Sequence, residues 1–90
     1  MLNELYQTIL NRMRELPTGS YTASLINKGE DEILKKIGEE SVEVILAAKA
    51  QGNARLVEEI ADLTYHVLVL LAVKNLSPAD IAVELEKRRK

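Results

Sequence analysis

Two acidic clusters, set in apolar helical sequence on either side of a short turn, restrict how this chain can fold. Residues 39–43 read E-E-x-x-E, and residues 58–62 read E-E-x-x-D. The surrounding apolar residues recur at helical spacing, where carboxylates are normally scarce. Because residues i, i+3 and i+4 share one side of a helix, each cluster predicts a line of carboxylates beside an apolar seam.

The turn between the clusters, residues 50–53, decides whether they can meet. Gly52 suits the end of one helix and Asn53 suits the cap of the next, which predicts helices over 30–50 and 54–74. So short a connection makes the two helices antiparallel neighbours. Counted from the glycine, the acidic residues then lie at similar heights: Glu59 at ~11 Å, Glu43 at ~14 Å, Asp62 at ~15 Å and Glu40 at ~18 Å.

Four carboxylates at one level of a helical hairpin repel one another unless they bind a cation. Carboxylate ligands, no cysteine and a single histidine favour a hard ion. Mg²⁺ fits best, with Mn²⁺ as an alternative, because carboxylates and substrate phosphates together complete its coordination. The ordinary alternative is a solvated helix surface, but two facing clusters flanked by core residues favour a metal site. The expected ligands are Glu40, Glu43, Glu59 and Asp62.

Length and composition indicate one all-α domain spanning residues 1–90. The net charge of −2 argues against nucleic acid or a membrane surface as the main partner. The absence of cysteine excludes a disulfide framework and is compatible with a reducing cytosol, so we expect a cytoplasmic protein. The N-terminus lacks the pattern of a signal peptide, and the longest apolar run, residues 67–73, is too short to cross a bilayer.

Flanking helices are expected on both sides of the hairpin. Apolar spacing predicts the first over residues 3–15, and Ser77-Pro78-Ala79-Asp80 is a typical start for the last. Residues 20–29 show no convincing period and are expected to form an irregular connection. Either this is an ordinary polar loop, or its hydroxyl, phenol and ammonium groups bind phosphate and sugar oxygens. Those groups belong to Ser20, Tyr21, Thr22, Ser24 and Lys28.

Both long helices are apolar on more than one side. Val42 and Leu46 stand opposite the seam of the first helix, and Val69 and Val73 lie away from the seam of the second. A helix that is apolar on two sides is usually buried on two sides, and a chain this small has little to cover both. We therefore expect a homodimer whose hairpins pack into a helical bundle and bury residues 67–73.

A magnesium ion held by helical carboxylates favours hydrolysis of a polyphosphate, because it polarises phosphoryl oxygens and orients a water. Lys36, one turn before Glu40, can offset phosphate charge, and Glu39 can take a proton from the attacking water. His66 follows Asp62 by one turn, where it either orients a ligand or fills the core. A di-iron site is disfavoured, because such bundles use E-x-x-H pairs.

Several short segments occur in an order that resembles a known group of enzymes. These segments are S-Y-T-A-S-L at 20–25, K-G at 28–29, K-K-I-G-E-E at 35–40, Glu43, and A-D-L-T-Y-H at 61–66. Together they resemble the MazG-like nucleotide pyrophosphohydrolases and, more narrowly, the phosphoribosyl-ATP pyrophosphohydrolase family of histidine biosynthesis. The resemblance covers roughly residues 5 to 89. A general nucleotide pyrophosphohydrolase and a non-catalytic helical dimerisation module remain as alternatives.

The resemblance implies hydrolysis of 1-(5-phosphoribosyl)-ATP between its α and β phosphates by a stand-alone enzyme rather than a fusion with a cyclohydrolase. It implies that Glu40, Glu43, Glu59 and Asp62 hold Mg²⁺ and that Glu39 activates the water. Lys36 and the segment from Ser20 to Lys28 would bind the phosphates and the additional ribosyl phosphate. The implied catalytic residues are therefore Glu39, Glu40 and Glu43.

Overall fold

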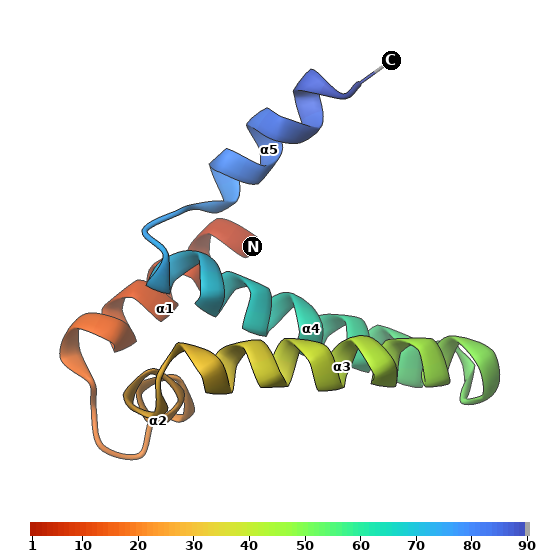
Figure 1. The fold of residues 1–90 in the computed structure, drawn as a ribbon, viewed down its shortest axis with the longest axis horizontal. Helices are drawn as coiled ribbons and strands as arrows, with labels where there is room; N and C mark the ends of the chain where they lie inside the picture. Colours follow the sequence, from red (N-terminus) through yellow and green to blue (C-terminus); the bar gives the residue numbers. More distant parts are fainter. Residues whose placement is uncertain (90) are drawn as a thin grey trace.

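The computed structural model describes residues 1–89, which form five α-helices and no β-strand (Figure 1). The helices are α1 (Leu2–Glu15), α2 (Tyr21–Lys28), α3 (Glu30–Ala50), α4 (Gly52–Val73) and α5 (Pro78–Lys87). The expected all-α class and the long helical hairpin are confirmed. In Figure 1, α1 and α2 lie at one end of the α3–α4 hairpin, while α5 points away from it. No helix in the part described is long and apolar enough to cross a membrane.

The turn of the hairpin is tighter than the sequence predicts. Gln51 caps both helices, and α4 already begins at Gly52 rather than at residue 54. Gly52 has a φ of 84°, a left-handed conformation that costs glycine little, so one residue reverses the chain. The expected Asn53 cap is therefore wrong, because Asn53 already lies inside the helix.

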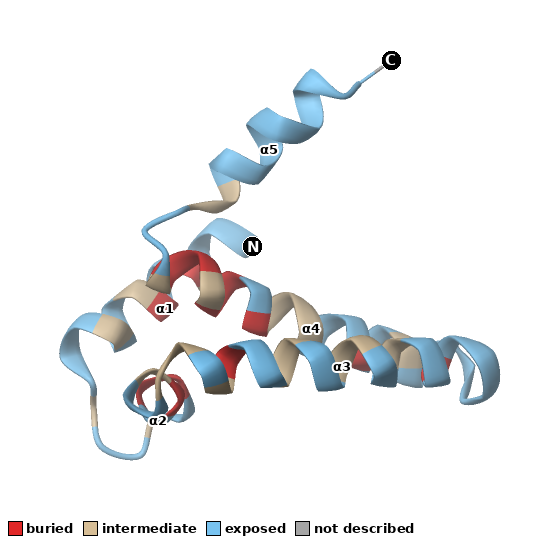
Figure 2. Cartoon of the chain, viewed as in Figure 1, coloured by how far each residue is buried: buried red, intermediate tan, exposed pale blue. Residues whose placement is uncertain are grey.

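The apolar core lies at the end of the hairpin where α1 and α2 pack (Figure 2). Its buried members come from four helices and are Tyr6, Ile9, Leu25, Ile33, Leu68, Val69, Leu71 and Ala72. Val69 is 0% exposed within this single chain, whereas Val67 is 37% exposed. The expectation that the Val69 side of α4 needs a second chain is thus wrong: the single chain's own core already covers it.

Residues 21–28 form the helix α2, which corrects the expected irregular connection. Ser20 caps it, and the Ser20 Oγ accepts a hydrogen bond from the Ala23 backbone N–H at 3.2 Å. Ala23 and Leu25 pack inward, so the helix is stabilised by burial. Two turns are too few for a clear apolar period, which is why the sequence pattern did not predict this helix.

Helix α5 begins as the sequence predicts but has no buried residue. The Ser77 backbone N–H donates to Asp80 Oδ2 at 2.8 Å, and Pro78 occupies the first turn. The apolar side chains of Ile81, Val83 and Leu85 are 45 to 64% exposed. Figure 2 shows α5 as an exposed helix beyond the packed end of the molecule.

Candidate active site

Three helices meet at His66, which is 5% exposed. His66 Nδ1 lies 3.0 Å from the Asp62 carbonyl oxygen and 2.6 Å from Glu40 Oε1 of α3, while Nε2 lies 2.7 Å from the Tyr21 hydroxyl of α2. A carbonyl only accepts, so the neutral ring carries its proton on Nδ1 and Tyr21 donates to Nε2. His66 is therefore both a buried histidine and the link between Tyr21 and Glu40.

Glu40 carries a buried oxygen with no hydrogen bond from residues 1–89. Its Oε1 lies 2.6 Å from His66 Nδ1, but the Nδ1–H points at the Asp62 carbonyl, so this contact is not a hydrogen bond. Burial raises the pKa of Glu40, His66 and Lys36 oppose that shift, and the charge of Asp62 adds to it. A buried carboxylate oxygen in this condition is satisfied by a cation or a proton.

The other predicted ligands are arranged differently from Glu40. Glu59 is 6% exposed and pairs with the Arg55 guanidinium, which also lies 2.9 Å from Glu58. Glu43 and Asp62 are exposed on the same side of the hairpin. Among the residues described, no three His, Asp or Glu side chains converge closely enough to hold a metal ion. The structure thus brings Glu40 close to His66, with Asp62 near enough to affect the pKa of Glu40, but does not assemble all four carboxylates.

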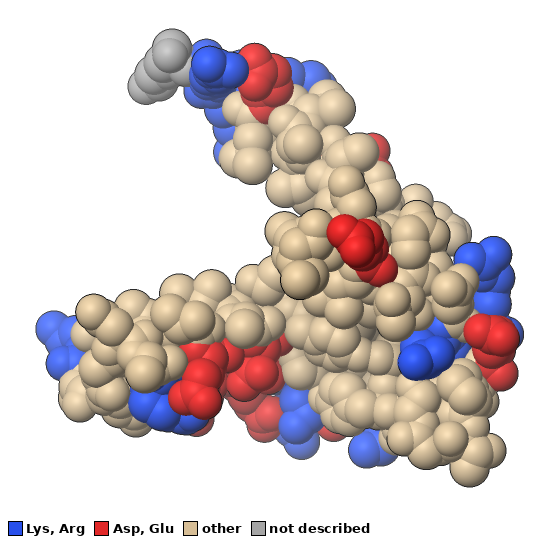
Figure 3. Space-filling model, turned by 180° about the vertical axis from the view of Figure 1, so that it is seen from behind, with Lys and Arg blue, Asp and Glu red and all other residues tan. Residues whose placement is uncertain are grey.

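The carboxylates nevertheless suit Mg²⁺ in type. Figure 3, seen from behind, shows acidic side chains gathered along one side of the α3–α4 hairpin. Glu40 Oε1 lacks a hydrogen-bond donor within residues 1–89, and Glu59 already binds a cationic group, the guanidinium of Arg55. Oxygen ligands around a hard ion are the chemistry this donor set offers.

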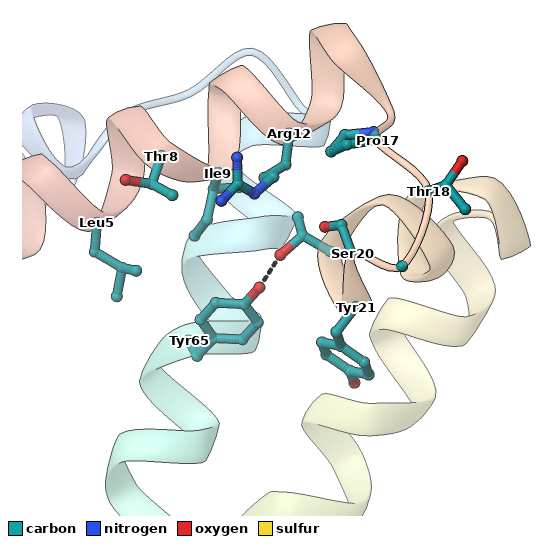
Figure 4. Close-up of a pocket in the computed structure, with 11 residues that line it drawn as sticks. Leu5, Thr8, Ile9, Arg12, Pro17, Thr18, Ser20, Tyr21 and Tyr65 are labelled. Carbon is teal, nitrogen blue, oxygen red and sulfur yellow. Dashed lines mark hydrogen bonds between the residues drawn. The ribbon is translucent and has the colours of Figure 1, made fainter.

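The substrate-binding residues predicted within residues 20–28 line two adjoining cavities around α2. Ser20, Tyr21 and Thr22 line a cavity of about 550 Å³ that α1 closes on its other side (Figure 4). Ser24 and Lys28 line a second cavity of about 410 Å³, to which Ser20 also contributes. The expected single phosphate-binding segment is thereby divided between two surfaces, because residues 21–28 are helical and point to different sides.

Lys36 and Glu39 lie on the exposed side of α3 next to Glu40. Their charged groups are 3.9 Å apart, with side chains 38% and 53% exposed. Burial raises the pKa of Glu40, and the positive charge of Lys36 partly offsets that rise, which places the ammonium within electrostatic reach of the carboxylate. Both residues therefore face solvent where a phosphate and a water can approach.

Tyr65 is a site residue that the sequence did not single out as a contact. Its hydroxyl and that of Thr22 form a hydrogen bond that joins α4 to α2 (Figure 4). Its ring centroid lies 6.2 Å from that of Tyr21 and 5.4 Å from that of His66. Burial and the charge of Glu40 raise the pKa of Tyr21, which keeps its hydroxyl a donor to His66. The two tyrosines separate the cavity from the carboxylates.

Comparison with known proteins identifies the family. The model of the phosphoribosyl-ATP pyrophosphohydrolase family matches residues 2–89. A phosphoribosyl-ATP pyrophosphatase from Saccharolobus solfataricus is 51% identical over 90 residues, which are 100% of this chain and 96% of the relative. One from Pelotomaculum thermopropionicum is 56% identical over 89 residues, or 99% and 91% of the two chains. The resemblance inferred from the sequence motifs is confirmed, and the chain belongs to the phosphoribosyl-ATP pyrophosphohydrolase family.

Proposed function

We propose that this chain hydrolyses 1-(5-phosphoribosyl)-ATP between its α and β phosphates, giving phosphoribosyl-AMP and pyrophosphate in the second step of histidine biosynthesis. The observation that carries the proposal is the buried Glu40 Oε1, which lacks a hydrogen bond from residues 1–89 and lies beside Asp62 and His66. Such an oxygen suits a cation-assisted reaction, and the adjoining tyrosine-lined cavity offers room for a large nucleotide. Membership of the family supplies the substrate.

Glu40, Glu43, Glu59 and Asp62 would hold Mg²⁺, or Mn²⁺ as the alternative ion. When bound there, the ion supplies a Lewis acid that polarises the phosphoryl oxygens. Glu59 would exchange the guanidinium of Arg55 for the ion, and His66 would keep Glu40 oriented through their 2.6 Å contact. Tyr21 fixes the ring of His66 by donating to its Nε2. Residues that orient a ligand in this way raise both metal affinity and activity.

Glu39 would take the proton from the attacking water, and Lys36 would bind the phosphates. Both side chains are partly exposed beside Glu40, so they can reach solvent and substrate without rearrangement of the helix. A general base must come within hydrogen-bond distance of the water, and Glu39 precedes the buried carboxylate directly in the chain. Glu39 is therefore the proposed base.

The proposed partner is a second copy of the chain. Ile45 on α3 and Ile60 on α4 are 61% and 45% exposed, and helical spacing places them opposite the side of Glu43 and Asp62. Val57 and Val67 add 67% and 37% exposed apolar side chains to α4. A homodimer that packs these apolar sides together buries them and leaves the acidic side open to substrate.

Product analysis tests this proposal directly. With Mg²⁺, the protein is incubated with phosphoribosyl-ATP, ATP and dUTP side by side, and the released phosphate species are separated. We expect pyrophosphate as the first product from phosphoribosyl-ATP and poor turnover of the other two. Orthophosphate as first product would overturn the bond assignment. Equal turnover of all three nucleotides would instead identify a general nucleotide pyrophosphohydrolase.

A further inference from the structure

The cavity between α1 and the start of α2 contains a cationic side chain that the proposed chemistry does not use. Arg12 of α1 lines it, opposite Ser20 and Tyr21 (Figure 4). Thr8 of α1 and Thr18 of the loop before α2 add hydroxyl groups to the lining. The cavity of about 550 Å³ is therefore lined by one guanidinium and several hydroxyls, with no acidic residue among its lining residues.

Arg12 differs from the other arginines of residues 1–89 in having no side-chain partner there. Arg14 donates to Asn11, Arg55 pairs with Glu58 and Glu59, and Arg88 and Arg89 pair with glutamates of α5. A guanidinium presents five donors in a planar fork that matches phosphate oxygens. An arginine that lines a cavity without an acidic neighbour is thus suited to bind an anion.

The cavity adjoins the carboxylate site through one layer of side chains. Tyr21 and Tyr65 line the cavity, and the Tyr21 hydroxyl lies 2.7 Å from His66, which contacts Glu40. A ligand that reached both sites would cross the two tyrosine rings, whose centroids are 6.2 Å apart. Tyr21 is 52% exposed, so its ring is accessible to a flat base.

We infer that this cavity binds the distal ribosyl phosphate of the substrate and that Arg12 is the residue that recognises it. The inference rests on the proposed function, because phosphoribosyl-ATP carries a triphosphate at one end and a phosphate monoester at the other. The triphosphate belongs at the acidic side of the hairpin with its cation. The monoester needs a separate cationic group, which is the guanidinium of Arg12. The hydroxyls of Thr8, Thr18 and Ser20 can add hydrogen bonds to its oxygens. ATP lacks this group, so the cavity distinguishes the two nucleotides.

The test compares Arg12→Gln with Arg14→Gln. Arg14 lies on the same helix, is exposed and does not line the cavity, so its variant controls for charge and helix stability. We expect Arg12→Gln to lower the ratio of kcat/KM for phosphoribosyl-ATP to that for ATP by roughly 10- to 100-fold, mainly through KM. Arg12→Lys should recover part of the loss, and Arg14→Gln should keep the wild-type ratio.

A binding measurement separates this inference from the proposed function. Ribose 5-phosphate is titrated in EDTA into isotopically labelled protein, and the amide signals of residues 18–22 are followed. We expect shifts in the wild type and in Arg14→Gln that are lost in Arg12→Gln. Failure of the wild type to cleave phosphoribosyl-ATP would overturn the proposed function, whereas the cavity would stand on this titration. An unchanged substrate ratio in Arg12→Gln, or equal shifts in all three proteins, would overturn the assignment of Arg12.

Discussion

The two ends of the α3–α4 hairpin differ in how their apolar side chains are covered. At the end that contacts α1 and α2, Ile33 and Val69 are both 0% exposed. Toward the turn, Ile45 and Val57 are 61% and 67% exposed, and the buried residues of that half are only Ala47 and the charged Glu59. The same two helices are thus the core of the molecule at one end and an uncovered arm at the other.

This difference indicates which interactions stabilise each half. The packed end buries apolar residues from four helices, and such burial is the main favourable term in folding. The far end consists of two helices, which bury little when only their facing sides are covered. The contact between Glu40 and His66 lies between the two regions, so one side of the site rests on the core and the other on the arm.

Val69→Asp should have the largest effect, because it breaks the packed end. The substitution places a charge among fully buried apolar side chains and should cost more than about 4 kcal/mol, enough to unfold a domain of this size. Circular dichroism should show loss of the helical signal at every protein concentration. Ile45→Asp is the matched control at the far end and should keep its helices. A helical, merely monomeric Val69→Asp protein would contradict this view of the core.

Glu40→Gln should lower the rate of hydrolysis by more than about 100-fold. Even the mutation of residues that only orient metal ligands typically lowers activity or metal affinity 10- to 100-fold. In EDTA, by contrast, the same substitution should not lower the stability of the folded protein and should raise it at high pH. Burial raises the pKa of Glu40, so the folded state binds this proton more tightly than the unfolded state, and stability falls as pH rises through the raised pKa.

At pH 8 the ionised Glu40 therefore destabilises the metal-free protein, and Glu40→Gln should melt at an equal or higher temperature. The expected gain is about 1.4 kcal/mol for each unit by which the pKa is raised. It should vanish only as the pH falls well below the ordinary glutamate pKa of about 4.3, where the wild-type carboxyl is protonated in both states. Glu43→Gln is the control, because Glu43 is exposed and should lose activity with no change in stability. A Glu40→Gln protein that melts well below wild type at pH 8 would contradict the assignment.

Much of the fold follows from the sequence, because the long helices repeat their apolar spacing over many turns. The Gly52 turn and the Ser77 cap are local signals that the structure retains. Helix α2 escapes such reasoning, since eight residues are too few to show a period. The covering of Val69 also escapes it, because spacing reveals an apolar side but not which element packs on it.

The candidate site divides in the same way. His66 lies ~21 Å from Gly52 along α4, and Glu40 lies ~18 Å from it along α3. The contact between the two residues could therefore be predicted from the helical rise alone. The Arg55–Glu59 pair was also available, as an i, i+4 contact within one helix. Arg12 gives no such signal: it lies outside every motif, and only the packing of α1 against α2 brings it to the cavity.

Ile45→Asp should convert the proposed dimer to a monomer while the chain stays folded. Ile45 is 61% exposed in the single chain, so the substitution removes no contact of the core. A charge in an apolar interface between copies is costly, and we expect the dissociation constant to rise at least about 100-fold. Sedimentation equilibrium at micromolar concentration measures this. A monomeric wild-type protein under the same conditions would contradict the proposal that the exposed apolar side of the hairpin is a dimer interface.

Arg55→Gln should have the smallest effect. It tests whether the ion pair between Arg55 and Glu59 competes with Mg²⁺ for the Glu59 carboxylate. Arg55 now holds Glu59, a proposed metal ligand, and its own side chain is 49% exposed. The ion pair of an exposed arginine is screened by solvent and contributes little, so freeing Glu59 should tighten Mg²⁺ binding by no more than about 5-fold. Calorimetric titration of Mg²⁺ without substrate measures the change, with Arg14→Gln as a control for net charge. If Arg55 instead positions Glu59 for the ion, the variant will bind Mg²⁺ more weakly than the wild type. That result would overturn the proposal that Glu59 exchanges the guanidinium of Arg55 for the metal ion.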